Sequence, residues 1–270
     1  MKKKYKLFFV SDIHGNYEAL ISSLQEAHFD ETNSDHKLIV LGDVFDRGRE
    51  NLEVFTYLKH LTDIERAIVL LGNHGKFLLD YLNGMSVSPL NYIYNGTNET
   101  LADFLHQTAP FETWYLMEDI KHPTNADFAV WIGNACQDIN EEYPDLLPWL
   151  KRCPYYFESE HYIGVHAALD TEALDWHNPQ FAWRASLSGW DALDFDDGSF
   201  LGKRMTNVNG KTVIAGHFAT NRLRERYELG SVNDFSILDV NDDNGHKVFI
   251  DGCTILTGKV NVYVVEDSLL

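Results

Sequence analysis

The sequence predicts an α/β fold built around a parallel β-sheet. Three apolar runs, at 7–10, 38–41 and 67–71, are continuous rather than alternating, which is typical of strands buried on both faces. Segments with the periodicity of an amphipathic helix lie between them. Each run leads directly into glycine and acidic or imidazole side chains. Because strands and helices alternate, we expect right-handed crossovers and a parallel core.

The first third of the chain divides into three strands and three helices. Leu20, Ile21 and Leu24 recur at helical spacing after the first strand, and Leu52, Phe55 and Leu58 do so after the second. The strands are expected over 5–11, 38–41 and 66–71, and the helices over 16–28, 50–61 and 75–83.

A helical region interrupts this pattern from Gly84 to Lys151. It contains expected helices at 97–108, 126–142 and 145–151. No linker-like run of glycine, serine or charge flanks it, so we interpret 84–151 as an insertion or cap within a single domain spanning 1–270. The insertion could shape substrate access, or it could be a structural lid without a chemical role.

The second half of the chain is rich in β-branched and aromatic residues, which favours strands. Residues 241–245 have the composition of a hairpin turn. The expected strands are 155–157, 161–165, 212–215, 235–240, 248–250 and 260–265. Two of them lead into histidines, His166 and His217.

Composition limits the classes of partner. The formal net charge of −19 argues against an extended nucleic-acid surface, and it disfavours a phosphate substrate unless metals or local arginines reverse the field. Only three scattered cysteines occur, so we expect no disulfide framework and a cytoplasmic location. No apolar stretch of about 18 residues is present, so no membrane span is predicted. The sequence does not indicate an oligomeric state.

Candidate metal ligands follow the three parallel strands. Asp12 and His14 follow the first strand, Asp43 follows the second, and Asn73 and His74 follow the third. Open α/β sheets bind their ligands at the carboxyl ends of strands, so these side chains should meet at one edge. Carboxylate and imidazole suit a divalent transition metal. We therefore expect a metal site there, completed by His166 and His217 from the second half.

The ordered set Asp12, His14, Asp43, Asn73, His74, His166 and His217 resembles the calcineurin-like metallophosphoesterases. The segment GDVFDRG at 42–48 is similar to the branch that contains Ser/Thr protein phosphatases and diadenosine tetraphosphate hydrolases. Trp183-Arg184 and Ile250-Asp251-Gly252 resemble later blocks of that branch, so the resemblance spans nearly the whole chain. It implies a central β-sandwich of mixed sheets, flanked by helices and carrying a helical insertion.

The resemblance also implies two divalent metal ions, with Mn²⁺ expected first and Fe, Zn or Mg as alternatives. Asp43 would bridge them, and a hydroxide between the metals would attack phosphorus in line. One metal would be held by Asp12, His14 and His217, and the other by Asn73 and His166.

The remaining roles carried over from the resemblance concern protons and phosphate. His74 would be the general acid, and Asp46 the carboxylate that orients it. Arg47 would bind the phosphate bidentately, with Arg184 as a second clamp, and Asn73 would also contact substrate. The implied function is hydrolysis of phosphomonoesters or phosphoanhydrides, with a phosphorylated protein or a small nucleotide as substrate.

Four positions depart from the family pattern. Gly75 replaces an acidic residue, Leu71 replaces an arginine common in protein phosphatases, and Ala168 and Phe218 follow His166 and His217 where glycine and threonine are frequent. Two alternative functions stay open. One is a metal-dependent phosphodiesterase or nuclease, and the other is a metal-binding module with weakened catalysis.

Overall fold

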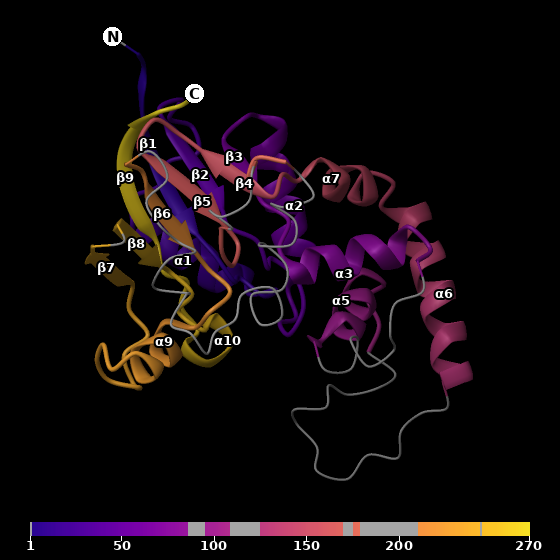
Figure 1. The fold of residues 1–270 in the computed structure, drawn as a ribbon. Coiled ribbons are helices and arrows are strands. Elements are labelled where there is room, and N and C mark those ends of the chain that lie inside the picture. The colour runs from indigo at the N-terminus through magenta and orange to yellow at the C-terminus, as the bar shows by residue number, and fades with distance from the viewer. Residues whose placement is uncertain (1, 86–94, 109–124, 170–174, 179–209, 244) are drawn as a thin grey trace.

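Two β-sheets stacked face to face form the centre of the fold (Figure 1). The computed structural model describes residues 2–85, 95–108, 125–169, 175–178, 210–243 and 245–270. The first sheet has the order β3-β2-β1-β9, formed by Ala67–Val69, His36–Val40, Lys4–Val10 and Tyr263–Ser268. The second has the order β4-β5-β6-β8-β7, formed by Tyr156–Glu158, Tyr162–Val165, Thr212–Ala215, Gly245–Phe249 and Leu238–Asp242. The predicted sandwich of mixed sheets is confirmed.

Parallel pairing places the carboxyl ends of the inner strands together. β1, β2 and β3 are mutually parallel, with Val10 opposite Val40 and Val40 opposite Val69. β5, β6 and β8 are parallel in the second sheet, whereas its edge strands β4 and β7 are antiparallel. β7 and β8 form the predicted hairpin. β9 pairs antiparallel with β1, so the end of the chain returns to the first sheet.

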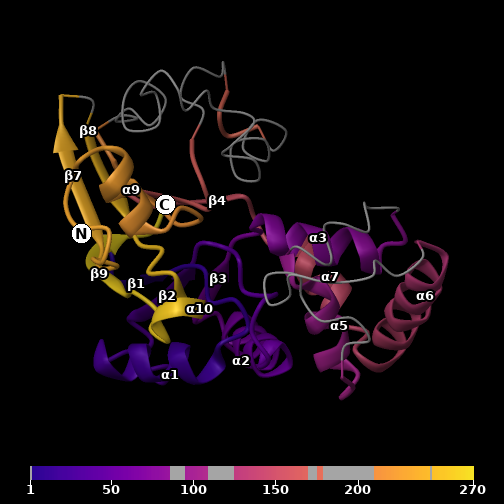
Figure 2. The same cartoon turned by 90° about the horizontal axis from the view of Figure 1, so that it is seen from below.

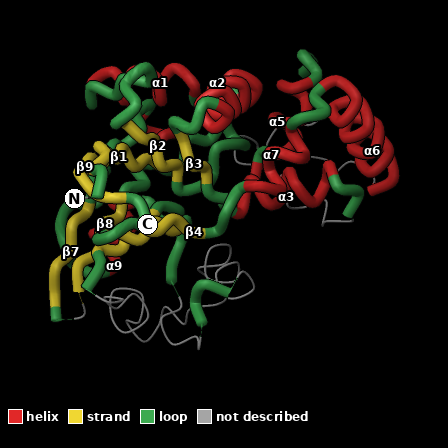
Figure 3. Tube along the Cα trace, turned by 90° about the horizontal axis from the view of Figure 1, so that it is seen from above, coloured by secondary structure: helices red, strands yellow, loops and turns green. Residues whose placement is uncertain are grey.

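Helices cover both outer faces of the sandwich. Figures 2 and 3 show α1 (Tyr17–Glu26) and α2 (Asn51–Asp63) on one side and α9 (Thr220–Arg226) on the other. In β1, Phe8 and Val10 pack toward α1 and α2, while Leu7 and Phe9 pack between the sheets. Both faces of this strand are therefore apolar, which explains its continuous apolar run.

The region after β3 forms a group of helices beside the β3 edge of the first sheet (Figures 1 and 3). It contains α3 (Asn73–Leu82), α5 (Thr97–Phe104), α6 (Asn125–Glu142) and α7 (Leu146–Arg152). Phe104 and Trp149 belong to the same buried cluster as the outer face of the first sheet. The helix expected over 97–108 ends at Phe104, and His106 has a positive φ of 52°, which is incompatible with its continuation.

Two short helices were not predicted, α9 and α10 (Thr254–Thr257). Both are too short for a reliable helical period. β9 begins at Tyr263 rather than at 260, because Val260 is buried in a loop and its backbone N–H donates to Ser23 Oγ. None of the described helices is long and apolar enough to cross a bilayer.

Candidate active site

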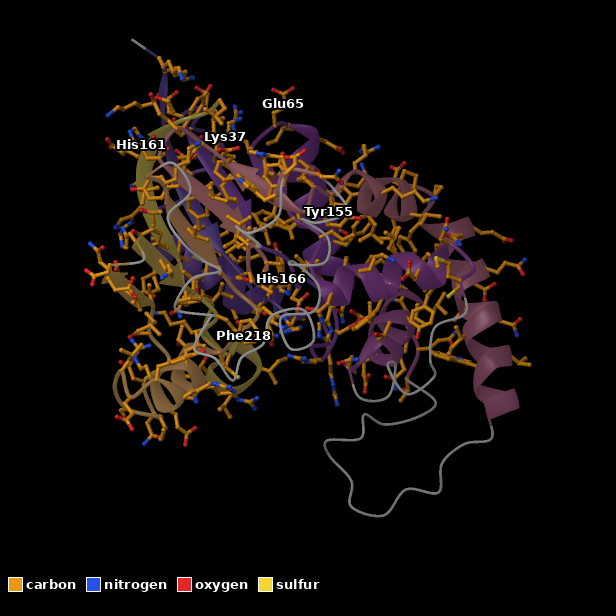
Figure 4. All side chains as sticks on the ribbon, in the orientation of Figure 1. Lys37, Glu65, Tyr155, His161, His166 and Phe218 are labelled. Carbon is orange, nitrogen blue, oxygen red and sulfur yellow. The ribbon has the colours of Figure 1, made fainter. Side chains whose placement is uncertain are left out.

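Loops that leave the carboxyl ends of strands from both sheets converge on one site. Asp12 follows β1 and Asp43 follows β2, while Asn73 begins α3 shortly after β3. His166 follows β5 and His217 follows β6 in the second sheet. In Figure 4 the side chains of His166 and Phe218 lie at the same end of the two sheets. The structure thus brings together the acidic, amide and imidazole side chains that the strand ends predicted.

The carboxylate of Asp43 lies at the centre of the site. Its Oδ2 is 3.2 Å from His166 Nε2 and 3.8 Å from His74 Nε2. Its Oδ1 accepts a 3.0 Å hydrogen bond from the backbone N–H of His74. Two groups of metal-capable atoms share this residue, one with His14 and His74 and the other with His166 and His217. Asp43 is therefore placed to contact cations on both sides.

The His166 ring faces a cluster of electron-pair donors with its Nε2 atom. Its Nδ1 lies 2.7 Å from the carbonyl oxygen of Leu41, so this nitrogen carries the donated hydrogen in the neutral ring. Its Nε2 then faces Asn73 Oδ1 at 2.9 Å and His217 Nδ1 at 3.2 Å. His217 Nε2 is buried and has no hydrogen-bond partner among the described residues. Donor atoms gathered in this way suit a bound cation.

The His14 ring is held in the same manner. Its Nδ1 donates to the carbonyl oxygen of Phe45 at 2.9 Å, and its Nε2 lies 3.9 Å from Asp12 Oδ1. Metal-binding histidines commonly donate their second ring N–H to a carbonyl or carboxylate, which fixes the tautomer and orients the ring. His14 and Asp12 therefore have the arrangement expected of metal ligands.

The position of His217 differs from the partition that the resemblance implies. Its ring groups with Asp43 and His166 rather than with Asp12 and His14. Its contact with Asp12 is made by the backbone N–H, which donates to Asp12 Oδ2 at 2.8 Å. The backbone N–H of His217 therefore faces Asp12, while its ring lies beside His166, with Nδ1 3.2 Å from His166 Nε2.

Glycines allow the loops of the two sheets to approach one another. A Cβ atom on Gly72 would overlap the carboxylate of Asp43, and one on Gly216 would overlap Ser11 and Asp12. Close backbone approach of this kind requires glycine.

Non-glycine residues with left-handed backbone conformations cluster at the site. Of the eleven such residues in the described part of the chain, six belong to the site: Asp12, His14, Asp43, Asp46, Arg47 and His217. Such residues cost on the order of 1–3 kcal/mol each, and they concentrate at functional sites. The sharp reversal after each strand turns these side chains toward a common point.

His74 and Asp46 form a buried pair beside this cluster. His74 Nδ1 lies 2.7 Å from Asp46 Oδ2, and Asp46 is fully buried. Arg47 Nη2 lies 3.0 Å from His74 Nε2, and Arg47 Nη1 lies 2.9 Å from His14 Nε2. Arg47 therefore stands between the imidazole of the pair and the candidate metal ligands. Arg184, the predicted second clamp, lies outside the described residues.

Two threonines of α5 complete the environment of Asp46. Thr97 Oγ1 donates to Asp46 Oδ2 at 2.8 Å, and Thr100 Oγ1 donates to Asp46 Oδ1 at 2.6 Å. Both hydroxyls come from α5, which lies in the region 84–151 that the sequence predicts to be an insertion, so α5 contacts the site directly. Sequence reasoning missed them because nothing local distinguishes them from ordinary helical threonines.

Replacing Thr100 with valine is expected to destabilise the protein by about 1–3 kcal/mol, because a buried carboxylate then loses a hydrogen bond at nearly constant side-chain volume. Urea unfolding measures the change. The matched control is Thr56→Val, which removes an exposed hydroxyl bonded to the Leu52 carbonyl and should change stability by less than about 0.5 kcal/mol. Equal effects of the two substitutions would contradict a specific role for the Thr100 hydroxyl.

Burial and charge set the protonation states of the site. Burial lowers the pKa of His217, and the nearby His166 lowers it further, to about 3. Burial and the Arg47 guanidinium hold the pKa of His14 well below its usual range. Burial raises the pKa of Asp43, but His166 and His74 outweigh it and keep the pKa well below normal. Burial lowers the pKa of His166, but the Asp43 carboxylate outweighs it and raises the pKa to about 9. The site therefore combines an anionic Asp43 with neutral His14 and His217 rings, which can donate electron pairs.

Two of the positions that depart from the family pattern are in contact. A Cβ atom on Gly75 would lie 3.0 Å from Leu71 Cδ1. The leucine side chain therefore occupies the space beside the glycine. Because the acidic residue and the arginine are both absent, no buried charge is left without a partner. The leucine side chain also leaves no empty gap beside the glycine.

A pocket of about 370 Å³ opens over the site. Asp12, His14, Asp43, Arg47, His74 and His217 line one part of it. The remaining wall comes from α9, α10 and the loops beside them, and includes Arg222, Arg226, Asp251 and Thr254. Burial raises the pKa of Asp251 to about 6.

This fold and this cluster of aspartate, asparagine and histidine define a phosphoesterase of the calcineurin type. A sequence model of the calcineurin-like phosphoesterase family matches residues 5–229, so the chain belongs to that family.

Among individual proteins, the chain is similar to symmetrical bis(5'-nucleosyl)-tetraphosphatases. It is 39% identical over 79 residues to the protein of Klebsiella pneumoniae (strain 342), which covers 29% of this chain and 27% of that protein. It is 35% identical over 99 residues to the protein of Nitrosococcus oceani, which covers 37% of this chain and 32% of that protein. The matched segment thus spans about a third or less of the length of these curated relatives.

Solved structures share the fold over nearly the whole chain. A candidate diadenosine tetraphosphatase superimposes with a TM-score of 0.56 at 15% identity, covering 98% of this chain and 94% of that one. The cold-active protein-tyrosine phosphatase of a psychrophilic Shewanella superimposes with a TM-score of 0.52 at 15% identity, covering 98% and 80%. At this level of identity the comparison supports the fold alone.

Proposed function

We propose that the protein hydrolyses phosphomonoesters or phosphoanhydrides with the help of two divalent metal ions. The observation that carries this proposal is the shared position of Asp43, whose carboxylate belongs to both groups of metal-capable side chains. Two cations held close together need a common anionic ligand, and the low pKa of Asp43 keeps it charged.

The residues of the site fit such a pair of metals. Asp12 and His14 would hold one ion, and Asn73, His166 and His217 would hold the other, with Asp43 between them. Mn²⁺ is the first candidate, because imidazole, carboxylate and amide oxygen are all acceptable to it, and Fe, Zn and Mg are alternatives. When bound, the metals would supply positive charge to the phosphoryl group and a hydroxide nucleophile near neutral pH.

The proton needed by the leaving group would come from His74. Its Nδ1–H is donated to Asp46, so Nε2 is the atom at which the ring takes up and releases the exchangeable proton. Arg47 would orient the phosphate through its two terminal nitrogens, one of which lies beside His14 and the other beside His74. Asn73 would also contact the substrate, and Arg184 would be a second residue that binds the phosphate.

The proposed substrate is a small nucleotide or a phosphorylated protein. The relatives named as bis(5'-nucleosyl)-tetraphosphatases favour the nucleotide, although they align over only part of their length. The cytoplasmic location and the single-domain organisation stay predictions of the sequence.

Removal of metal is expected to abolish hydrolysis. Treatment of the purified protein with a chelator should reduce turnover of p-nitrophenyl phosphate and diadenosine tetraphosphate to background, and Mn²⁺ should restore it, because the proposed hydroxide nucleophile forms only on bound cations. Phosphate release measures the activity, and elemental analysis measures bound metal. Undiminished turnover by the verified metal-free protein would contradict a metal-dependent mechanism.

The same assay separates the alternatives. Faster cleavage of bis-p-nitrophenyl phosphate than of the monoester would indicate a phosphodiesterase or nuclease. Metal binding without turnover of any of the three substrates would indicate a binding module. The hydrolase proposal expects monoester or anhydride cleavage to exceed diester cleavage.

A further inference from the structure

A third buried carboxylate lines the pocket together with Asp12 and Asp43. Asp251 follows shortly after β8, and β8 is parallel to β6, whose carboxyl end leads to His217. The residue is only 6% exposed, and it belongs to the pocket wall. None of the roles proposed above uses it. Asp251 therefore occupies a strand end of the same kind as those that carry the proposed metal ligands.

Hydrogen bonds hold Asp251 in place but leave one of its oxygen atoms available. Its backbone carbonyl accepts a 2.9 Å bond from the N–H of Thr220, and its Oδ1 accepts a 2.7 Å bond from the N–H of Cys253. Its Oδ2 has no hydrogen-bond partner among the described residues, and it is not sealed from solvent. Because the residue lines the pocket, this oxygen is available to a group bound there.

The three carboxylates influence one another. Burial raises the pKa of Asp12 well above its usual range, and the charge of Asp251 raises it further, more than that of any other neighbour. Burial also raises the pKa of Asp251, and the charge of Asp43 adds to this effect. Like charges that share a site oppose each other's ionisation. A divalent cation among them would relieve the repulsion.

The two proposed cations differ in how many protein ligands they would have. Asp12 Oδ2 already accepts hydrogen bonds from the Ser11 hydroxyl and from the backbone N–H of His217, which leaves Oδ1 for a cation. Under the proposed assignment, the ion at Asp12 and His14 has fewer protein ligands than the ion at the other group. A further carboxylate nearby should therefore affect its binding most.

We propose that Asp251 is a further acidic residue of the metal centre, which strengthens binding of the cation that Asp12 and His14 would hold. This inference rests on the proposed two-metal function and deepens it. Within the described part of the chain, Asp251 belongs to neither group of donor atoms around Asp43 that could share one ion, so it acts through a water molecule rather than as a direct ligand. Residues that support a metal in this way contribute about 10- to 100-fold to its affinity.

The test compares the full-length wild type with the substitution Asp251→Asn. The amide keeps the size of the side chain, and its oxygen can still accept the hydrogen bond from Cys253. Calorimetric titration of the chelator-treated protein with Mn²⁺ should show one of the two Kd values raised by about 10- to 100-fold and the other changed by less than about 3-fold. Asp35→Asn is the matched control, because it removes an exposed carboxylate paired with Lys3 and should leave both Kd values within about 2-fold.

Thermal unfolding separates this role from a purely structural one. Without metal, Asp251→Asn removes one of three neighbouring carboxylates, so its melting temperature should equal or exceed that of the wild type. At the same Mn²⁺ concentration, its melting temperature should rise by less than that of the wild type, because stabilisation by a ligand falls as its Kd rises. A lower melting temperature of the metal-free variant would indicate a structural role and overturn the proposal.

The possible outcomes separate the two levels of the proposal. If the wild type binds no Mn²⁺, the proposed two-metal function fails, and the role of Asp251 fails with it. If the wild type binds two ions and Asp251→Asn binds both with unchanged affinity, the role of Asp251 is refuted and the two-metal proposal stands. A raised KM for p-nitrophenyl phosphate with unchanged Mn²⁺ affinity would assign Asp251 to substrate binding, which also refutes the inference.

Discussion

Replacing His74 with asparagine is expected to lower turnover of phenyl phosphate by about 100- to 10,000-fold, the usual contribution of a general acid. The structure places the His74 ring between the buried carboxylate of Asp46 and the pocket, so its Nε2 can deliver a proton to a leaving oxygen. The asparagine side chain can occupy part of this space but does not exchange a proton near neutral pH.

The choice of substrate makes this prediction specific. Phenolate needs protonation more than p-nitrophenolate does, because it is the stronger base. The loss for p-nitrophenyl phosphate should therefore be clearly smaller than the loss for phenyl phosphate. Steady-state kinetics with both substrates measures the difference, and equal losses would show that His74 does not act as an acid.

Metal content is the control for His74. Its ring also lies in a group with His14 and Asp43 that could hold a cation, which offers an alternative role as a ligand. Under the general-acid role, His74→Asn keeps its metals and its melting temperature close to those of the wild type. A loss of one ion per chain would instead identify His74 as a metal ligand.

The second large effect is expected from Asp43→Asn. The neutral amide cannot offset the charge of two neighbouring cations, so metal content should fall to about one ion per chain or less. Residues that only orient a metal ligand contribute about 10- to 100-fold to metal affinity or activity. Loss of the shared ligand itself should therefore reduce turnover by more than about 100-fold. Elemental analysis and phosphate release measure the two effects.

An exposed aspartate–histidine pair provides the matched control. Asp239 lies 2.8 Å from His246 on the β7–β8 hairpin, and its side chain is 54% exposed. Asp239→Asn should keep both metals and nearly full activity, because a solvated pair contributes little. If Asp43→Asn also retains two ions per chain, the shared-ligand proposal is wrong.

The first sheet and one edge of the site were predictable from local sequence. β1 and β2 are buried on both faces, and this produces the continuous apolar runs from which they were recognised. Asp12, Asp43 and His74 follow directly at strand ends or at a helix start, so their relative positions depend mostly on parallel pairing. The prediction of both mixed sheets came from the family resemblance, and it is confirmed.

Features that depend on distant contacts were not predictable in this way. The pairing of β9 with β1 joins the two ends of the chain, and no local pattern specifies it. The ring of His217 lies beside His166 because a backbone hydrogen bond to Asp12, 205 residues away in sequence, sets the turn. The support of Asp46 by Thr97 and Thr100 depends on how α5 packs.

By itself, the sequence determined which strands are buried and which chemical groups follow them, because periodicity and strand-end position are local properties of the chain. Only the tertiary structure decided that the α5 hydroxyls reach Asp46 and that Asp251 shares a pocket with Asp43. The physical reason is that such contacts arise from the packing of segments far apart in the chain, where small differences in helix placement decide which side chains meet.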